Sequence, residues 1–194
     1  AKEPITKRDT SKDVLRERLA SDNKLVRLLL NRAKLDPKRV VFAEADQLAV
    51  LKAAQIAYED GIAFPILLGR KETIQSLMKE IEFDADVPII DPKTEEENSR
   101  KDKYAKVYWE QRKRRGITYY SAQRLMRERN YFAAMMVNEG DADALISGYS
   151  RNYPTVVKPM LELIGLVKGA TRIATTNVMM TKRGPLFLSD TSIN

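Results

Sequence analysis

The chain contains no histidine and no cysteine. These two absences exclude a Ser-His-Asp triad, a Cys-His pair, CxxC redox chemistry and any zinc site built from His or Cys ligands. They also exclude a disulfide, so nothing in the sequence indicates an oxidising compartment. Any chemistry must therefore use hydroxyl, carboxylate, amine, guanidinium or backbone groups, and we predict no metal site.

Long hydrophobic runs are also missing. No apolar run approaches the roughly 18 residues that a membrane-spanning helix needs, and the first four residues (AKEP) have no signal-peptide character and no initiator Met. We expect a cytoplasmic protein without a membrane partner, and an internal piece of a longer chain. A length of 194 residues predicts one domain, or one domain and part of another.

Positive charge is in excess, with 34 Lys and Arg against 27 Asp and Glu, which gives a net charge of +7. This excess is typical of a solvated basic surface. It is equally typical of a protein with an anionic partner, such as a nucleic acid, an anionic lipid or a phosphorylated metabolite. Charge alone does not choose among these alternatives.

Strand-like and helix-like patterns alternate after Asp36-Pro37, which ends a leucine-rich helical region. Strands are predicted at 40–43, 65–69, 87–90 and 142–147, and helices at 13–20, 24–34, 48–58, 72–80, 94–115, about 118–139 and from Pro154 onward. Thr118 or Ser121 is expected to cap the helix that ends near 139, and Pro159 should kink or break the last helix. Strands that alternate with helices favour parallel βαβ units, so we predict an α/β fold, a three-layer α/β/α arrangement with a mostly parallel sheet.

Three regions are predicted along the chain. Residues 1–36 form lead-in helices and a linker, and residues 37–170 form a first α/β domain. Residues 171–194 begin a second domain, with strands at 172–180 and 186–189. Because the chain ends directly after a strand, we expect the fold to be incomplete.

The loop after the 142–147 strand is the strongest candidate site. In an open α/β sheet, ligands bind beyond the carboxyl ends of the strands, and the N–H groups at the start of the next helix attract anions. Gly148 permits a tight turn close to a ligand. The polar candidates around it are Ser147, Ser150, Arg151, Asn152 and Thr155. A plain turn with Asn152 as the helix cap is the simpler alternative.

A basic run, Gln111 to Gly116, closes the long helix at 94–115. Cations are favoured at a helix C-terminus, which is a structural explanation of the run. Phosphate capture by Arg112 and a nucleic-acid surface are the functional alternatives. The aromatic residues upstream, Tyr104, Tyr108 and Trp109, could stack on bases, but their spacing is more simply explained by a helix face that packs inward. Glu44, at the end of the first strand, is either a site residue or a structural partner.

Several stretches, taken in order, resemble phosphotransacetylases over residues 37–194. They are 39–44 (RVVFAE), 51–54 (LKAA), 65–70 (PILLGR), 115–118 (RGIT), 131–137 (YFAAMMV), 140–148 (GDADALISG) and 184–194 (GPLFLSDTSIN). The first and the last are most similar to the phosphotransacetylase-like C-terminal domain of multidomain NADP-dependent malic enzymes. The resemblance implies a two-domain phosphotransacetylase-like fold, of which this chain is just over half.

The resemblance also implies a ligand. Phosphotransacetylases transfer an acetyl group between coenzyme A and phosphate in a cleft between two α/β domains. Arg112 matches a family arginine that binds substrate anions, and Lys158 stands where the family usually has an arginine. The family's Ser-Arg and Asp catalytic elements lie in the half that this sequence lacks, so no catalytic residue is assigned here. The residues expected to bind acetyl-CoA or phosphate are Arg112, Ser147, Gly148, Ser150, Arg151, Asn152, Thr155 and Lys158.

In malic enzymes with this appended domain, the resemblance implies regulation: acetyl-CoA binds the domain and controls the oxidative decarboxylation of malate. NADP and a divalent metal would then belong to a malic enzyme domain upstream. The alternative is an active phosphate acetyltransferase that interconverts acetyl-CoA and phosphate with acetyl phosphate and CoA. We expect a homo-oligomer, and a nucleic-acid-binding module is a third hypothesis that we set below these two.

Overall fold

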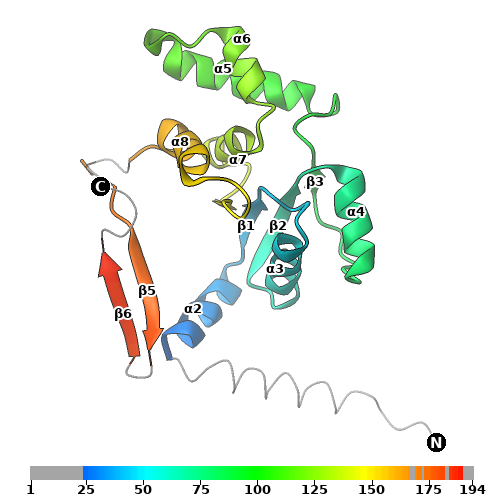
Figure 1. Ribbon diagram of the computed structural model, residues 1–194, viewed down its shortest axis with the longest axis vertical. Helices are drawn as coiled ribbons and strands as arrows, with labels where there is room; N and C mark the ends of the chain where they lie inside the picture. Colours follow the sequence, from blue (N-terminus) through cyan, green and yellow to red (C-terminus); the bar gives the residue numbers. More distant parts are fainter. Residues whose placement is uncertain (1–23, 167–168, 172, 182–183, 190–194) are drawn as a thin grey trace, which may run out of the picture. The chain divides into compact units, whose positions relative to one another are not determined.

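The computed structural model describes residues 24–166, 169–171, 173–181 and 184–189 (Figure 1). The chain divides into two compact units, of which one comprises residues 36–169 and the other combines residues 1–35 with 170–194. The helix predicted at 13–20 and the last residues of the 184–194 motif lie outside the described residues.

The larger unit is built on a parallel sheet. Its strands are β1 (Lys38–Phe42), β2 (Ala63–Leu68), β3 (Ile89–Ile90) and β4 (Ala144–Ile146), in the order β3-β2-β1-β4. Strand β1 pairs in parallel with both β2 and β4, with Phe42 opposite Leu67 and Ile146. The predicted α/β class with a mostly parallel sheet is confirmed, and each predicted strand overlaps an observed one.

Alternate strand residues enter two separate cores, because side chains point to opposite faces of a sheet with a period of two. Phe42 and Leu67 join the core beneath α3 (Leu48–Glu59) and α4 (Lys71–Glu80). Their neighbours Val41 and Leu68 join the other core, which also contains the buried aromatic Phe132. Helices therefore supply apolar side chains to both faces of the sheet.

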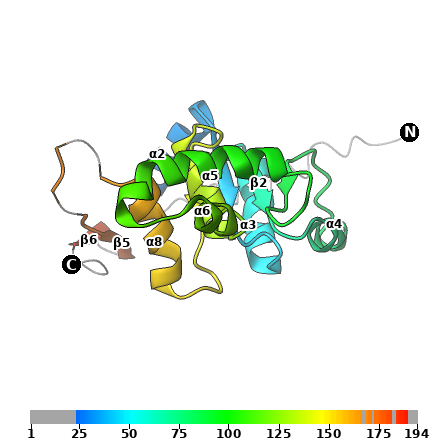
Figure 2. The ribbon, with the colours of Figure 1, turned by 90° about the horizontal axis from the view of Figure 1, so that it is seen from above.

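Four helices build the second core. They are α5 (Asn98–Arg112), α6 (Tyr119–Leu125), α7 (Arg129–Asn138) and α8 (Tyr153–Leu163), with a short 3-10 turn, η1 (Lys113–Arg115), after α5. Figures 1 and 2 show α5 as an outer helix that crosses the end of this unit beyond α7. The predicted aromatic face of α5 is confirmed, because Tyr104 and Tyr108 are buried in this core.

One helix prediction is wrong. A single helix was expected from about 118 to 139, but the chain forms α6 and α7 with a turn between them, in which Glu128 donates its backbone N–H to the carbonyl of Leu125 at 2.9 Å. The turn contains neither Gly nor Pro, so the sequence has no local signal that would predict a helix break there. A tertiary ion pair at the first residue of α7, described below, accompanies the break. The predicted cap is confirmed, since the Thr118 hydroxyl accepts the N–H of Ser121.

The helix over Tyr153–Leu163 also differs from expectation. Pro154 lies in its first turn, as predicted. Pro159, however, does not end the helix, which continues without interruption to Leu163. Pro159 and Leu163 are both buried, so packing offsets the lost backbone hydrogen bond.

The smaller unit contains α2 (Lys24–Leu35) and an antiparallel hairpin of β5 (Thr176–Thr181) and β6 (Gly184–Ser189). The hairpin exposes apolar side chains, of which Phe187 is 60% and Met179 52% accessible. In the part of the chain that the structure describes, no helix is long and apolar enough to span a bilayer.

Candidate functional site

The candidate site lies at the carboxyl edge of the parallel sheet. Glu44 follows the end of β1 by two residues, and Ser147 directly follows β4. Strands β1 and β4 are parallel neighbours, so their carboxyl ends meet at one edge. The sheet topology thereby brings together two residues that are 103 positions apart.

The Glu44 carboxylate occupies the loop that follows β4. Its Oε1 accepts the backbone N–H groups of Gly148 at 2.8 Å and Tyr149 at 3.0 Å, and its Oε2 accepts the N–H of Ser150 at 2.8 Å and the hydroxyl of the same residue. Glu44 itself is only 4% exposed. The loop amides that the sequence assigned to an anionic ligand therefore bind the protein's own carboxylate.

The pKa of Glu44 reflects two opposing effects. Burial of the carboxylate acts to raise the pKa, because the charged form loses solvation. Hydrogen bonds from the Ser150 hydroxyl and the three loop amides favour the charged form and outweigh burial, so the pKa lies below its usual value. Glu44 is consequently a fixed negative charge at neutral pH, and this makes it a structural partner of the loop.

The first turn of α7 completes the polar network. The Ser147 hydroxyl donates to Asn130 Oδ1 at 2.8 Å, and the Asn130 amide donates to the carbonyl of Thr155 at 3.4 Å. Arg129 forms a bidentate ion pair with Asp46, at 2.7 and 2.6 Å. Asn130 and Asp46 were not identified from the sequence, and only their positions after a turn and after β1 could have suggested them.

A strand-end hollow of about 130 Å³ opens beside this network. Its lining residues are Glu44, Lys93, Arg127, Glu128, Arg129, Asn130, Tyr131, Arg151 and Thr155. Three of its cations, Lys93, Arg127 and Arg151, form no ion pair with any residue that the structure describes. Ligand pockets for drug-sized molecules measure about 300–1,000 Å³, so this hollow suits a phosphate-sized anion rather than a whole cofactor.

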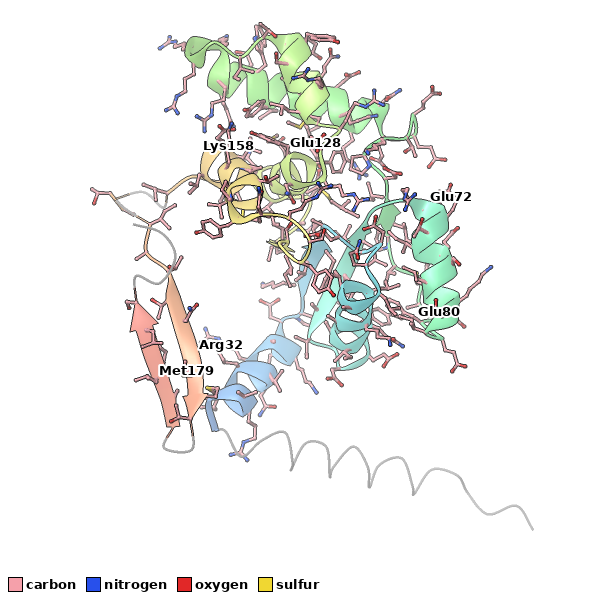
Figure 3. All side chains as sticks on the ribbon, viewed as in Figure 1. Arg32, Glu72, Glu80, Glu128, Lys158 and Met179 are labelled. Carbon is pink, nitrogen blue, oxygen red and sulfur yellow. The ribbon has the colours of Figure 1, made fainter. Side chains whose placement is uncertain are left out.

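Helix α8 carries a second group of the predicted residues. The predicted Thr155 and Lys158 are spaced by three positions, and Glu162, which was not predicted, follows four positions later, which places all three along one face of the helix. Asn152 occupies the N-cap position, but its side chain accepts the Thr155 hydroxyl and not a backbone N–H. Figure 3 labels Lys158 on α8 and Glu128 at the N-cap of α7, and these two helices pack against each other.

Arg112 reaches this helix from the end of α5. Its Nη2 donates to the backbone carbonyl of Glu162, in the last turn of α8. Lys158 lies one turn earlier, at the middle of α8. Arg151 and Thr155 line the strand-end hollow at the other end of the helix. The predicted residues are thus spread along α8, with Arg151 and Thr155 at its start, Lys158 at its middle and Arg112 at its end.

A half-buried carboxylate, that of Glu162, lies at the Arg112 end of α8. Glu162 Oε2 accepts the hydroxyls of Tyr108 at 3.0 Å and Tyr131 at 2.9 Å. Burial, followed by the hydrogen bond to Glu162, raises the pKa of Tyr108 to about 12, so this phenol stays a neutral donor. Glu162 was missed from the sequence, although its position four residues after Lys158 is a signal that could have found it.

No group of three or more Asp and Glu side chains is arranged to hold a metal ion among the residues with described positions. The groups that the site can offer to a ligand are therefore cations, amides and hydroxyls. Such a set binds phosphate oxygens by charge-assisted hydrogen bonds.

Comparison with known proteins gives consistent matches. A family model described as phosphate acetyl/butaryl transferase matches residues 24–194. The NADP-dependent malic enzyme of Salmonella typhimurium is 33% identical over 199 residues, which is 100% of this chain and 26% of that protein. The phosphate acetyltransferase of Thermoanaerobacterium thermosaccharolyticum is 30% identical, over 88% of this chain and 52% of that protein.

Solved structures agree with these matches. EutD phosphotransacetylase from Staphylococcus aureus has a TM-score of 0.73 and 30% identity, over 86% of this chain and 51% of that chain. The chain thus spans about a quarter to a half of the relatives that it matches. The resemblance inferred from the sequence motifs is confirmed.

Proposed function

We propose, since the chain belongs to the phosphate acetyl/butaryl transferase family, that it binds acetyl-CoA as a regulatory ligand of an NADP-dependent malic enzyme. One observation favours a malic enzyme over a phosphate acetyltransferase. The match to the malic enzyme of Salmonella typhimurium extends over 100% of this chain, whereas the matches to two phosphate acetyltransferases extend over 88% and 86%. The residues before the shared fold therefore also have a counterpart in malic enzymes.

The cations around α8 support an acetyl-CoA ligand. Coenzyme A carries a diphosphate and a 3′-phosphate, and its anionic oxygens need several donors spread over some distance. Arg112 supplies positive charge at the end of α8, Lys158 at its middle, and Arg151 at the hollow by its start. Cations spread over this distance are suited to such an extended anion.

The lysine at position 158 supports binding over turnover. The family usually has an arginine there, and an arginine grips a phosphate with two parallel donors. Lys158 is a point charge on a flexible stem and does not orient a phosphoryl group in the same way. A ligand that only has to stay bound tolerates this change better than a reaction that requires alignment.

An active phosphate acetyltransferase is the second candidate, because the same family contains enzymes with that name. In that reaction the CoA sulfur attacks the carbonyl carbon of acetyl phosphate, the C–O bond to the phosphate breaks, and the thiol proton passes to the departing phosphate. The chain's cations would hold the departing phosphate and bring the reactants together.

Calorimetric titration with acetyl-CoA, together with an assay of acetyl-CoA formation from acetyl phosphate and CoA by the full-length protein, tests both candidates. Binding without turnover supports the regulatory proposal, and turnover that depends on Arg112 supports the second candidate. Absence of binding at millimolar acetyl-CoA contradicts both. Lys158→Ala is expected to weaken binding about fivefold to tenfold, and the exposed Lys79→Ala on α4 is the matched control.

The expected homo-oligomer stays a prediction. Light scattering of the protein at two concentrations tests it, and a monomer at both would contradict it.

A further inference from the structure

A second hollow lies between α5 and α6, with a volume of about 280 Å³. It shares a single residue, Arg127, with the strand-end hollow. Asn98, Lys101 and Asp102 line it from α5, and Tyr120, Gln123 and Arg124 from α6. None of these six residues belongs to the site proposed for acetyl-CoA.

The charge of this α5–α6 hollow is positive. Lys101 is only 8% exposed and its ammonium donates to the carbonyl of Thr94 at 2.8 Å. An ammonium has three donors, so two stay available for a ligand. Arg124 and Arg127 form no ion pair within the described part of the chain.

Asp102 is the one carboxylate in the lining, and it is held in place by Gln123, whose Nε2 donates to its Oδ1 at 3.0 Å. Its second oxygen has no hydrogen bond to any described side chain, so it can accept a hydroxyl from a ligand. A carboxylate that accepts a ribose hydroxyl is a recurring part of nucleotide recognition.

Tyr120 supplies an aromatic face. It is 75% exposed, although three other tyrosines of this unit, Tyr104, Tyr108 and Tyr131, are at least 91% buried. Tyr120 also makes no ring contact with another aromatic residue of the described chain. An exposed ring at the edge of a basic hollow is a stacking surface for a nucleobase.

We propose that the α5–α6 hollow binds a nucleoside phosphate. Arg124 and Arg127, with Lys101 behind them, hold the phosphate, Asp102 accepts a ribose hydroxyl, and the base stacks on Tyr120. This inference goes beyond the proposed function and does not depend on it, because Arg112, Lys158 and Arg151 take no part in it.

Adenosine 5′-monophosphate is the probe, titrated into the whole protein and followed by calorimetry and by backbone amide shifts in NMR spectra. We expect shifts around Tyr120 and Arg124, and tighter binding of this probe than of inorganic phosphate or adenosine. Arg124 is the residue to replace, since Arg127 lines both hollows. Arg124→Gln should weaken binding of the probe about tenfold.

Tyr120→Ala should weaken binding of adenosine 5′-monophosphate about fivefold or more and leave inorganic phosphate unaffected. The side chains of Arg124 and Tyr120 are both exposed, so neither replacement should disturb folding. The exposed Arg32→Gln on α2 is the charge-matched control and should change the affinity less than twofold.

The proposal is overturned if the amide shifts cluster at α8, if Arg124→Gln binds the probe as tightly as the unaltered protein, or if no binding is detected at millimolar probe. Amide shifts at Tyr120 and Arg124 report on this hollow, and shifts at α8 report on the site proposed for acetyl-CoA, so failure of either proposal leaves the other standing.

Discussion

The carboxylate of Glu44, at the end of β1, lies 2.8 Å from the backbone nitrogen of Gly148, at the end of β4, across a separation of 104 residues. One side chain thus replaces the ligand that a loop of free amides would otherwise attract. Glu44, which follows another strand, thus holds the loop in place. Helix α8, which carries Lys158, begins where the loop ends.

Replacement of Glu44 should destabilise the protein. Glu44→Gln removes a charged acceptor from three amides, and we expect a loss of about 1–3 kcal/mol in the free energy of unfolding, measured by urea denaturation at pH 7. Glu59→Gln, an exposed residue near the end of α3, is the control. A change of less than 0.3 kcal/mol, on the order of error in such measurements, would contradict the structural role of Glu44.

The Glu44 contribution should also depend on pH. The folded pKa lies below the unfolded value of about 4.3. Its stabilisation is therefore complete above that value and is lost as the pH falls through the folded pKa. The difference in unfolding free energy between the unaltered protein and Glu44→Gln should shrink as the pH falls from about 4.3 through the folded pKa. A constant difference across this range would argue against the assignment.

The Arg129–Asp46 pair should matter more than a surface pair. Its side chains are 25% and 10% exposed, and its geometry is bidentate. Asp46→Asn should cost about 2–4 kcal/mol, because it leaves a largely buried guanidinium without its counter-charge. Arg129→Lys keeps the charge but loses the fork, and should still be destabilising.

The exposed pair Lys113–Glu110 provides the comparison for that experiment. Glu110→Gln should change the unfolding free energy by about 0.5 kcal/mol or less. Equal effects of Asp46→Asn and Glu110→Gln in urea denaturation would mean that the Arg129–Asp46 pair does not help to position α7.

Asp143 should titrate at unusually low pH. Hydrogen bonds from the Arg39 side chain and backbone N–H hold its pKa at about 2, and this pair links the start of β1 to the residue before β4. In an NMR titration of side-chain carboxyl carbons, Arg39→Met should bring the midpoint of Asp143 towards about 3.9. An unchanged midpoint would show that Arg39 is not the cause.

Lys158→Arg should tighten acetyl-CoA binding, by about threefold to tenfold, because a guanidinium fork binds a phosphate with two parallel hydrogen bonds. Calorimetry measures the dissociation constant, and the exposed Lys79→Arg on α4 serves as the control. Weaker binding by Lys158→Arg than by the unaltered protein would mean that position 158 does not face a phosphate.

Much of the fold follows from local patterns. The apolar runs at 40–43 and 65–69 became β1 and β2, and the alanine-rich pattern at 48–58 became α3, each within two or three residues. A helix or strand that buries one face or both faces has a characteristic spacing of apolar residues, and that spacing can be recognised without the structure. The turn between α6 and α7 left no such mark, because it contains neither Gly nor Pro. The ion pair that accompanies it joins Arg129 to a residue 83 positions away.

The candidate site was predictable in position but not in its contacts. The residues after β4 were correctly placed at the carboxyl edge of a parallel sheet, since the βαβ pattern determines where strand ends meet. The sequence could not predict that Glu44 accepts the backbone N–H groups of Gly148, Tyr149 and Ser150. It also could not predict the hydrogen bond from Arg112 to the carbonyl of Glu162. Both depend on how distant segments pack.

By itself, the sequence determined the alternation of strands and helices, the exclusion of imidazole and thiol chemistry, and the motifs shared with a family. Only the tertiary structure decided which cations are free and which are already paired. Arg129 is held by Asp46, whereas Arg124 and Arg127 have no carboxylate partner among the described residues. The reason is physical: a charge pair forms wherever packing brings two side chains within a few ångströms, and sequence distance places no limit on that approach.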